Sequence, residues 1–342
     1  MKKRTRNIIL ILSATLVICC GIAGLLYHMA FGPSVNHFSK EDLDIYIYPE
    51  DSYEDVLSQI DSSIRYKSVF DLLAKYKKYN ESVKPGHYKI PGETNNNELI
   101  NRLISGNQQP VTVNFNSLRT LEYLSVVLSM QLEPDSAEFD HFFHDTVALL
   151  DMGIHPDSIF FFLLPDTYEF YWTATPEDFM KRMKSEAAKY WESKTSLAEK
   201  KGLSPWEVIT LAAIVEKETI KDDEKAAIAG VYLNRLNKRM RLQADPTVVY
   251  ATGDFSLRRV LKKHTQMDHP YNTYRNYGLP PGPICVPSKA SVEAVLNAED
   301  HKYLYFCAKE DMSGYHSFAK TYTQHLINAR RFQRELNKRG IK

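Results

Sequence analysis

Apolar and polar residues divide the chain into one long apolar stretch near the N-terminus and a mixed remainder. Residues 8–27 carry no charged side chain. At about 1.5 Å per helical residue, this stretch can cross a hydrocarbon core of roughly 30 Å. It therefore predicts a transmembrane helix over 8–27, preceded by a basic stub at 1–7.

Charged residues around this predicted helix indicate its orientation. By the positive-inside rule, we expect a cytoplasmic N-terminus and a single-pass protein of the cell (inner) membrane. Everything from His28 onward is then expected on the periplasmic or extracytoplasmic side. No comparable basic cluster follows the helix directly, and the basic residues before it are Lys2, Lys3, Arg4 and Arg6.

Two other targeting signals explain the same stretch less well. A cleaved signal peptide has a shorter apolar region, and no A-x-A-like site occurs before Pro33. A lipoprotein signal has small residues before its cysteine, whereas Leu16, Val17 and Ile18 precede Cys19. We therefore expect the helix to be retained as an anchor.

The region after the anchor has the short alternating patterns of a small α+β module, which we place at 38–115. β-Branched and aromatic residues indicate strands, and apolar residues at helical spacing indicate amphipathic helices. Gly106 is placed to end the last helix. The predicted strands are 44–48, 86–90 and 111–113, and the predicted helices are 53–60, 68–77 and 97–104.

The next region, 116–203, is predicted to be a helical connecting region. The run Phe160–Leu164 is too apolar to face water, so we expect it to pack beneath or beside the later core. Asp166 and Tyr168 follow this run, and the sequence leaves open whether they line a substrate groove or have a structural role. The predicted amphipathic stretches, which prolines separate, are 118–130, 136–150 and 176–200.

The last region, 204–342, combines helices with a loop-rich section. We expect the whole chain to be α+β, with two soluble domains on one anchor. The predicted elements are helices at 205–219, 223–239, about 290–298 and 320–338, a loop and strand section to about 287, and a strand at 303–306.

Composition supports folded domains and excludes one class of partner. Of the 342 residues, 44% are hydrophobic and 25% are charged, which is enough material for one large or two medium cores. The formal net charge is +1, whereas nucleic-acid binding needs a concentrated basic surface, so we exclude nucleic acid as a partner. In the exported part, Cys285 and Cys307 are open to a disulfide or to separate burial.

Two glutamates, Glu216 and Glu218, end a helix-like apolar run at 206–215. A carboxylate at the end of a buried helix is costly to ionise, so its pKa rises toward the value that a general acid needs near neutral pH. Two positions correspond to about 200° on a helix, so the two side chains point to opposite sides. Both sides are apolar, and periodicity alone does not choose between them.

A structural role is the competing interpretation of both glutamates. Buried carboxylates usually accept hydrogen bonds or ion pairs, and Arg235, Arg239 and Arg241 are candidate partners. Glycoside cleavage by water or through a covalent intermediate generally uses two carboxylates about 5 to 9.5 Å apart. Asp245 is the nearest second carboxylate, although an Asp before a proline is equally a turn former.

A tyrosine-rich string, Tyr271-Asn272-Thr273-Tyr274, follows about thirty residues later. Its aromatic faces, amide and hydroxyl groups can stack on a sugar ring and fix its hydroxyls. The alternative is a tyrosine-rich edge of the core.

Other chemistries lack their motifs in this sequence. There is no G-x-S-x-G elbow, Walker loop, C-x-x-C or H-E-x-x-H. The pair His141 and His144, and the group His264, Asp268 and His269, do not form a ligand set with a defined geometry. We therefore expect no metal site and no cofactor.

Several ordered strings in the second half of the chain carry a family resemblance. They are Ile214-Val215-Glu216-Lys217-Glu218-Thr219, Asn234-Arg235-Leu236, Met240-Arg241-Leu242-Gln243-Ala244-Asp245-Pro246-Thr247-Val248, Tyr271-Asn272-Thr273-Tyr274 and Gly278-Leu279-Pro280-Pro281-Gly282-Pro283-Ile284. Together they resemble the endolytic murein transglycosylases, the MltG or YceG-like family. The resemblance covers nearly the whole chain, including the N-terminal span and a LysM-like module around His87.

The resemblance implies a lytic transglycosylase that cleaves the β-1,4 bond between N-acetylmuramic acid (MurNAc) and N-acetylglucosamine (GlcNAc) in peptidoglycan strands and leaves a 1,6-anhydro end. It assigns the catalytic acid/base to Glu218 and a supporting position to Glu216. The predicted anchor, which would confine the enzyme to newly made strands near the membrane, also suggests contact with cell-wall synthases. The implied substrate-binding residues are Gln243, Asp245, Thr247, Tyr271, Asn272 and Tyr274.

Two departures and two alternatives accompany the resemblance. The stretch 114–117 lacks the usual Glu-Gly, and Pro287-Ser288 replaces Pro-Gly, so residue 288 must avoid a positive φ or tolerate strain. The alternative functions are a lysozyme-like hydrolase of the same bond and a peptidoglycan-binding scaffold without catalysis.

Overall fold

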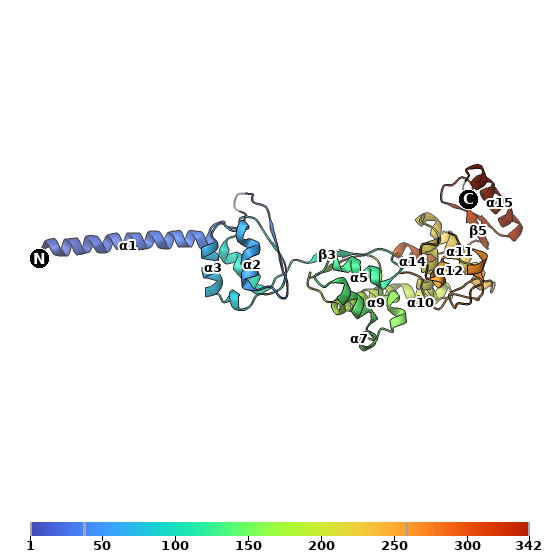
Figure 1. Cartoon of the computed structure of the whole chain (residues 1–342), viewed down its shortest axis with the longest axis horizontal. Helices are drawn as coiled ribbons and strands as arrows, with labels where there is room; N and C mark the ends of the chain where they lie inside the picture. Colours follow the sequence, from blue (N-terminus) through green and yellow to red (C-terminus); the bar gives the residue numbers. More distant parts are fainter. Residues whose placement is uncertain (1, 37–38, 258, 341–342) are drawn as a thin grey trace. The chain divides into compact units, whose positions relative to one another are not determined.

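The protein is described by a computed structural model, which covers residues 2–36, 39–257 and 259–340 (Figure 1). The chain forms two compact units. The first comprises residues up to 113 together with 131–134 and 169–174, and the second comprises 114–130, 135–168 and 175–342. Helices and strands occur together, as the α+β expectation requires.

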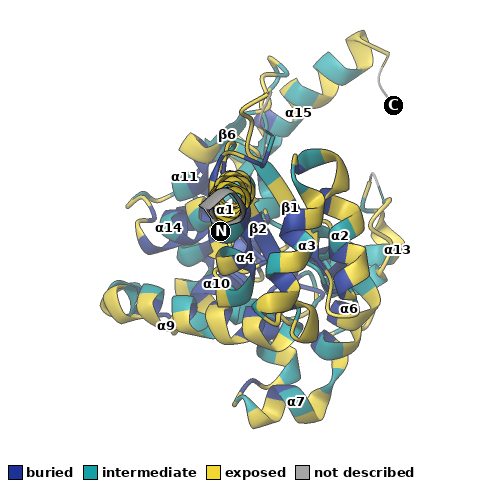
Figure 2. Cartoon of the chain, turned by 90° about the vertical axis from the view of Figure 1, so that its left-hand side faces the viewer, coloured by how far each residue is buried: buried dark blue, intermediate teal, exposed yellow. Residues whose placement is uncertain are grey.

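The N-terminal helix α1 spans Lys2–Phe31 and extends beyond the predicted 8–27. Among the described residues it is the one helix long and apolar enough to cross a membrane. Figure 2 shows it end-on and mainly exposed, and residues 6–28 are all exposed. Its last turn packs on the first unit, where Ala30 is buried and Asn96 Nδ2 donates to the Met29 carbonyl at 3.2 Å. The side chains of residues 2–4, on which the predicted orientation depends, lie outside the described part.

The first unit is built on an antiparallel pair, β1 (Leu43–Ile47) and β2 (Gly86–Ile90), with Leu43 opposite Ile90. Alternate residues of β1 face inward, and Ile45 and Ile47 are buried. Between the strands lie α2 (Tyr53–Ile60) and α3 (Lys67–Tyr76), and α4 (Asn96–Ser105) follows β2. These elements lie within two residues of the predicted positions.

The second unit is mainly helical. Its helices are α5 (Leu121–Ser129), α6 (Ser136–His144), α7 (Thr146–Asp151), α8 (Ile159–Phe162), α9 (Pro176–Lys200), α10 (Pro205–Glu218), α11 (Asp222–Asn237), α12 (Asp245–Thr252), α13 (Lys262–Thr265), α14 (Lys289–Leu296) and α15 (Tyr322–Lys338). The remaining strands form two pairs, β3 (Val111–Asn114) with β4 (Thr167–Phe170) and β5 (Tyr305–Ala308) with β6 (His316–Ala319).

Helix α10 is the central helix of the second unit. Ser204 and Glu207 form a capping box at its start, and Pro205 occupies the first turn, where a missing N–H costs nothing. Every residue from 208 to 215 is buried, mainly against α11 and α14. A helix that is apolar all round is stable only inside a core, so its polar C-terminal turn is carried to the core boundary.

Several elements after residue 115 differ from those expected. The expected helix 136–150 is two helices, because the Asp145 side chain caps the start of α7. Within the expected loop and strand section lies α12, which begins at Asp245. Residues 167–170 form the unexpected strand β4. Phe160, Phe161 and Phe162 are only partly buried, while Leu163 and Leu164 are buried.

Candidate active site

Glu218 is the last residue of α10, and its side chain is held against α11. Tyr232 on α11 is buried, and its hydroxyl donates a hydrogen bond of 2.5 Å to Glu218 Oε1. The glutamate itself remains partly exposed. One carboxylate oxygen is therefore oriented by the protein at a position that still meets the surface.

The surroundings of Glu218 favour its neutral form. Burial raises the pKa of this carboxyl to about 7, and the negative charge of Asp245 adds to the rise. The hydrogen bond from Tyr232 and the charge of Arg235 act in the opposite direction. Near neutral pH the group is therefore divided between the acid and its conjugate base, as general acid/base catalysis requires.

Glu216, two positions earlier, has different surroundings. Lys225 contacts its Oε2 at 3.2 Å, and the hydroxyls of Ser288 and Ser291 each donate to the same oxygen at 2.5 Å. Burial acts to raise the pKa of Glu216, but these hydrogen bonds and the lysine charge together hold it below its usual value. Glu216 is therefore a fixed anion that ties α10 to α11 and α14.

The serine at position 288 causes no backbone strain. Ser288 has φ −65° and ψ 154°, in the extended region, and it is the N-cap of α14. Its side chain accepts from the Ser291 backbone N–H and donates to Glu216. The departure noted in the sequence thus supplies a hydroxyl to the buried carboxylate.

Asp245 and Tyr274 form the second polar pair of the cluster. Tyr274 donates a hydrogen bond of 2.5 Å to Asp245 Oδ1, and Asp245 is exposed at the first turn of α12. Burial raises the pKa of Tyr274, with contributions from Asp245 and Glu218. The electrostatic influence of Asp245 on Glu218 places these three residues in one cluster.

Three further predicted residues organise the loops around this cluster. Thr247 is buried and shares a hydrogen bond of 2.8 Å with Thr273. Asn272 is also buried, and its amide donates to the carbonyls of Thr265 and Met267. Exposed Gln243, at φ 50°, donates its backbone N–H to Thr273 at 3.1 Å.

Tyr232 and Arg235 are residues whose place beside Glu218 the sequence analysis missed, although it named Arg235 as a candidate partner of the glutamates. Arg235 is buried, and its guanidinium donates to the carbonyls of Leu304 at 2.6 Å and Leu242 at 2.7 Å. An arginine was the expected partner of Glu216, but the structure pairs it with Lys225. The two missed residues are three positions apart on α11, so they share one face; that spacing is the signal available in the sequence.

Tyr271 belongs to a different surface of the second unit. Together with Trp206 and Tyr250 it lines a pocket of about 460 Å³ at the start of α10. Its ring centroid lies 4.6 Å from that of Tyr250. The predicted groove residues thus fall into a group beside Glu218 and one residue, Tyr271, in this pocket.

Asp166 and Tyr168 make structural contacts. Asp166 pairs with Lys289, which holds the pKa of this carboxyl below its usual value. The hydroxyl of buried Tyr168 donates to the Leu164 carbonyl at 2.5 Å. Cys285 and Cys307 are both free thiols, the first of them buried.

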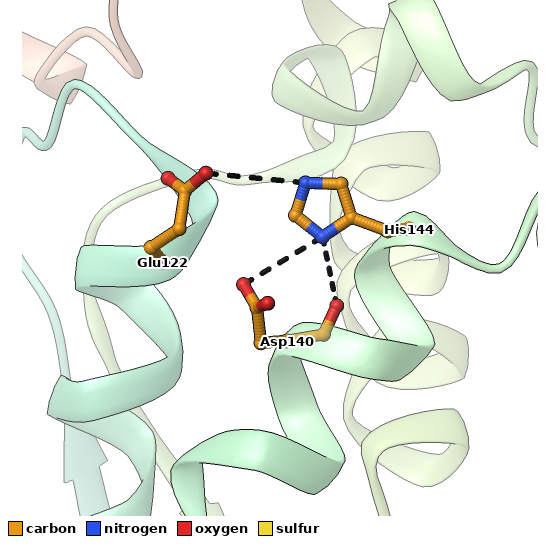
Figure 3. Close-up of side chains that lie close together, drawn as sticks. All are labelled: Glu122, Asp140 and His144. Atoms are coloured by element: carbon orange, nitrogen blue, oxygen red, sulfur yellow. Dashed lines mark hydrogen bonds and ion pairs between the residues drawn. The ribbon is translucent and has the colours of Figure 1, made fainter.

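One group of possible metal ligands combines His144 with Glu122 and Asp140 (Figure 3). Their ligand atoms lie within 4.8 Å of one another. His144 Nδ1 contacts the Asp140 carbonyl at 2.8 Å, and Nε2 lies 4.0 Å from Glu122. The side chains of Glu122 and His144 are more than half exposed, so the contacts fit a surface cluster of ion pairs.

Comparisons with known proteins give a consistent family assignment. Residues 45–331 match the YceG-like family. An endolytic murein transglycosylase of Bacillus subtilis is 41% identical over 165 residues, which are 48% of this chain and 45% of that protein. One from Streptococcus pneumoniae is 30% identical over 276 residues, which are 72% of this chain and 50% of that protein.

A solved structure agrees with these matches. The crystal structure of a YceG-like protein from Listeria monocytogenes is 27% identical, with a TM-score of 0.56, over 84% of this chain and 99% of that chain. The present chain spans about half the length of the curated relatives it matches. On its sequence match over residues 45–331, the chain belongs to the YceG-like family.

Proposed function

We propose that this protein is a membrane-anchored endolytic transglycosylase of peptidoglycan. It cleaves the MurNAc-β-1,4-GlcNAc bond and forms a 1,6-anhydro-MurNAc end, with Glu218 as the sole general acid/base. The observation that carries the proposal is the partly exposed Glu218 carboxyl, with a pKa of about 7 and one oxygen held by Tyr232. The names of the relatives support the reaction and the substrate.

The proposed reaction needs one group that first donates and then accepts a proton. Protonated Glu218 donates to the glycosidic oxygen as the bond between that oxygen and muramyl C1 breaks. The resulting carboxylate accepts the proton of the C6 hydroxyl while O6 bonds to C1, so the enzyme returns to its starting protonation state. The attacking oxygen belongs to the substrate, so its proximity to C1 replaces a water molecule.

Residues around Glu218 divide into two proposed roles. Asp245 and Tyr274 lie in the same polar cluster and, with exposed Gln243, are proposed to contact the strand. Buried Thr247 and Asn272 are proposed to act by holding the loops in shape. Glu216 supports the end of α10 through its serine and lysine partners, and Tyr271 contacts the strand farther away.

The competing hydrolase would use a second carboxylate to activate water. Asp245 is the candidate, but its Oδ1 already accepts a short hydrogen bond from Tyr274, which favours a positioning role. Cleavage in ¹⁸O-labelled water separates the two reactions. Transglycosylation yields unlabelled anhydro ends, and hydrolysis yields labelled reducing ends.

The anchor and the first unit place this activity at the cell membrane in our proposal. The length and composition of α1 support a single membrane span. The basic residues before it favour a cytoplasmic N-terminus, with the remainder on the periplasmic or extracytoplasmic side. The β1-α2-α3-β2 order of the first unit supports a LysM-like role in glycan binding. Tethering would confine the enzyme to nascent strands and to cell-wall synthases near the membrane.

Product analysis on purified sacculi tests the proposal. The full-length protein should release anhydro-ended fragments, and Glu218→Gln should fold normally and release none. A scaffold would bind sacculi and release no fragments with either protein. Equal release of anhydro-ended fragments by both proteins would show that Glu218 is not the catalytic acid/base.

A further inference from the structure

The pocket at the start of α10 is separate from the cluster around Glu218. Trp206, in the first turn of α10, and Glu218, at its end, are twelve positions apart, which corresponds to about 18 Å along the helix. The bond that is cleaved therefore cannot lie in this pocket. The span between the two sites is that of several sugar rings of an extended strand.

The walls of the pocket are aromatic and fixed in orientation. The indole N–H of Trp206 donates to the Pro281 carbonyl at 3.0 Å. A Cβ added to Gly282 would lie 2.8 Å from the Trp206 ring and 3.1 Å from the Tyr271 hydroxyl, so glycine allows this close approach. Tyr250 packs against Tyr271, and the pocket thus presents several rings, beside which Leu121 and Ile159 complete an apolar wall.

One carboxylate stands at the edge of these rings. Asp157 lines the pocket, and its side chain is 93% exposed. Tyr271 lines the same pocket, and burial raises its pKa to about 12, with a further rise from Tyr250 and a smaller one from the charge of Asp157. The pocket therefore combines flat apolar faces with a solvent-exposed carboxylate, whose Oδ2 lies 3.7 Å from His155 Nδ1 and which can still accept hydrogen bonds from a ligand.

The loop 271–274 links the pocket to the catalytic cluster. Tyr271 lines the pocket, whereas Tyr274 binds Asp245 beside Glu218. Buried Asn272 holds the loop between them through hydrogen bonds to two backbone carbonyls. A strand that passes Glu218 can thus follow one rigid loop toward the pocket.

We propose that the pocket lined by Trp206, Tyr250, Tyr271 and Asp157 is a distal glycan subsite, which binds an N-acetylhexosamine ring several units from the cleaved bond. The aromatic faces stack on the ring, and the Asp157 carboxylate accepts hydrogen bonds from its hydroxyl groups. The inference rests on the proposed function and explains how cleavage is directed to the interior of strands. Short strands cannot occupy Glu218 and the pocket together.

Kinetics with glycan strands of defined length test this subsite. The substrates are stem-free peptidoglycan tetrasaccharides and strands of at least twelve sugars, with the full chain in detergent micelles. Asp157→Asn and Trp206→Leu should each lower kcat/KM for the long strands by about 10-fold. The same variants should change cleavage of the tetrasaccharide less than about 2-fold. Asp300→Asn, an exposed site elsewhere, is the matched control.

Three outcomes would overturn the subsite. The first is an equal loss of kcat/KM on short and long strands, which indicates a structural role. The second is no loss on either substrate. The third is a loss seen only when the stem-free strands are replaced by strands that carry stem peptides, which indicates a peptide site. Asp157→Asn is expected to fold normally, because the Asp157 side chain makes few contacts, so a loss in this variant is not explained by misfolding. Binding of the same stem-free strands to Glu218→Gln, with and without Trp206→Leu, gives a readout without catalysis. A length-dependent loss of binding would support the subsite even if the proposed reaction fails.

Discussion

The two sides of the last turn of α10 carry the same residue type in opposite states. On one side, Glu216 is surrounded by Lys225 and two serine hydroxyls, which stabilise its anion. On the other, Glu218 has one tyrosine hydroxyl and a nearby carboxylate, and burial raises its pKa to about 7. Partners, rather than the helix itself, thus separate a structural glutamate from a catalytic candidate.

The comparison also shows how burial acts on a carboxyl. Burial favours the neutral form of both glutamates, but at Glu216 the donors and the lysine charge outweigh it. At Glu218 the single hydrogen bond from Tyr232 does not outweigh the effect of burial. Each side can therefore be altered separately, because none of the contacts of Glu216 involves Glu218.

The largest expected effect is on catalysis. Glu218→Gln keeps the side-chain volume but cannot exchange a proton, so the rate of anhydro-end formation should fall by at least about 10³-fold. Glu216→Gln should retain most of the activity of the folded enzyme. Mass spectrometry of products from sacculi, normalised to folded protein, measures both. A comparable rate loss in the two variants would contradict the proposal that Glu218 is catalytic and Glu216 structural.

The next effect is on the pH dependence of stability. The pKa of Glu218 is raised in the folded state, so its contribution to stability is fully present below about 4.5, the ordinary pKa of a glutamate, and is lost as the pH rises through about 7. Glu218→Gln should therefore be more stable than the wild type at pH 8, on the order of 3 kcal/mol, and nearly equal at pH 4. Urea denaturation at the two pH values checks this. A variant that is less stable at pH 8 would contradict the raised pKa.

Glu216→Gln should change stability with the opposite sign. The pKa of Glu216 is lowered in the folded state, so its contribution to stability is present above 4.5, the ordinary pKa of a glutamate, and is lost as the pH falls through the folded pKa. The variant leaves buried Lys225 without this partner and should lose about 2 kcal/mol at pH 7. The loss should shrink near pH 3. Urea denaturation at pH 7 and pH 3 measures it, and an equal loss at both pH values would argue against an ionic role.

The smallest expected effects are shifts of the pH–rate profile. Tyr232→Phe removes a hydrogen bond that lowers the pKa of Glu218, so the alkaline limb should move to higher pH. Asp245→Asn removes a charge that raises this pKa, so the limb should move to lower pH. We expect each rate at the optimum to fall by about 10-fold. Steady-state rates across the pH range measure the shifts. If the alkaline limb moves in the same direction in both variants, either Tyr232 or Asp245 does not act on the pKa of Glu218 as described.

Local signals in the sequence predicted much of the fold. Helix α9 begins and ends where expected, because Thr175 and Asp178 form a capping box and Pro176 opens the first turn. Helix α12 was missed, because an Asp-Pro pair starts a turn as readily as a helix. Strand β4 depends on pairing with β3, which no local pattern reveals.

The candidate site was predicted in part. The family motif selected Glu218, and the apolar run before it gave the physical reason for a raised pKa. Tyr232 was missed because its contact depends on how α10 and α11 pack, and spacing within either helix does not encode it. Likewise, Tyr271 and Tyr274 are close in sequence but line different surfaces.

Titration of Glu218 tests the central claim most directly. Infrared difference spectra between the wild type and Glu218→Gln, recorded from about pH 4 to 9, isolate the absorption of this carboxyl. The account predicts a protonated band that disappears with a midpoint at about pH 7. A carboxyl that is already fully ionised at pH 5 would contradict it.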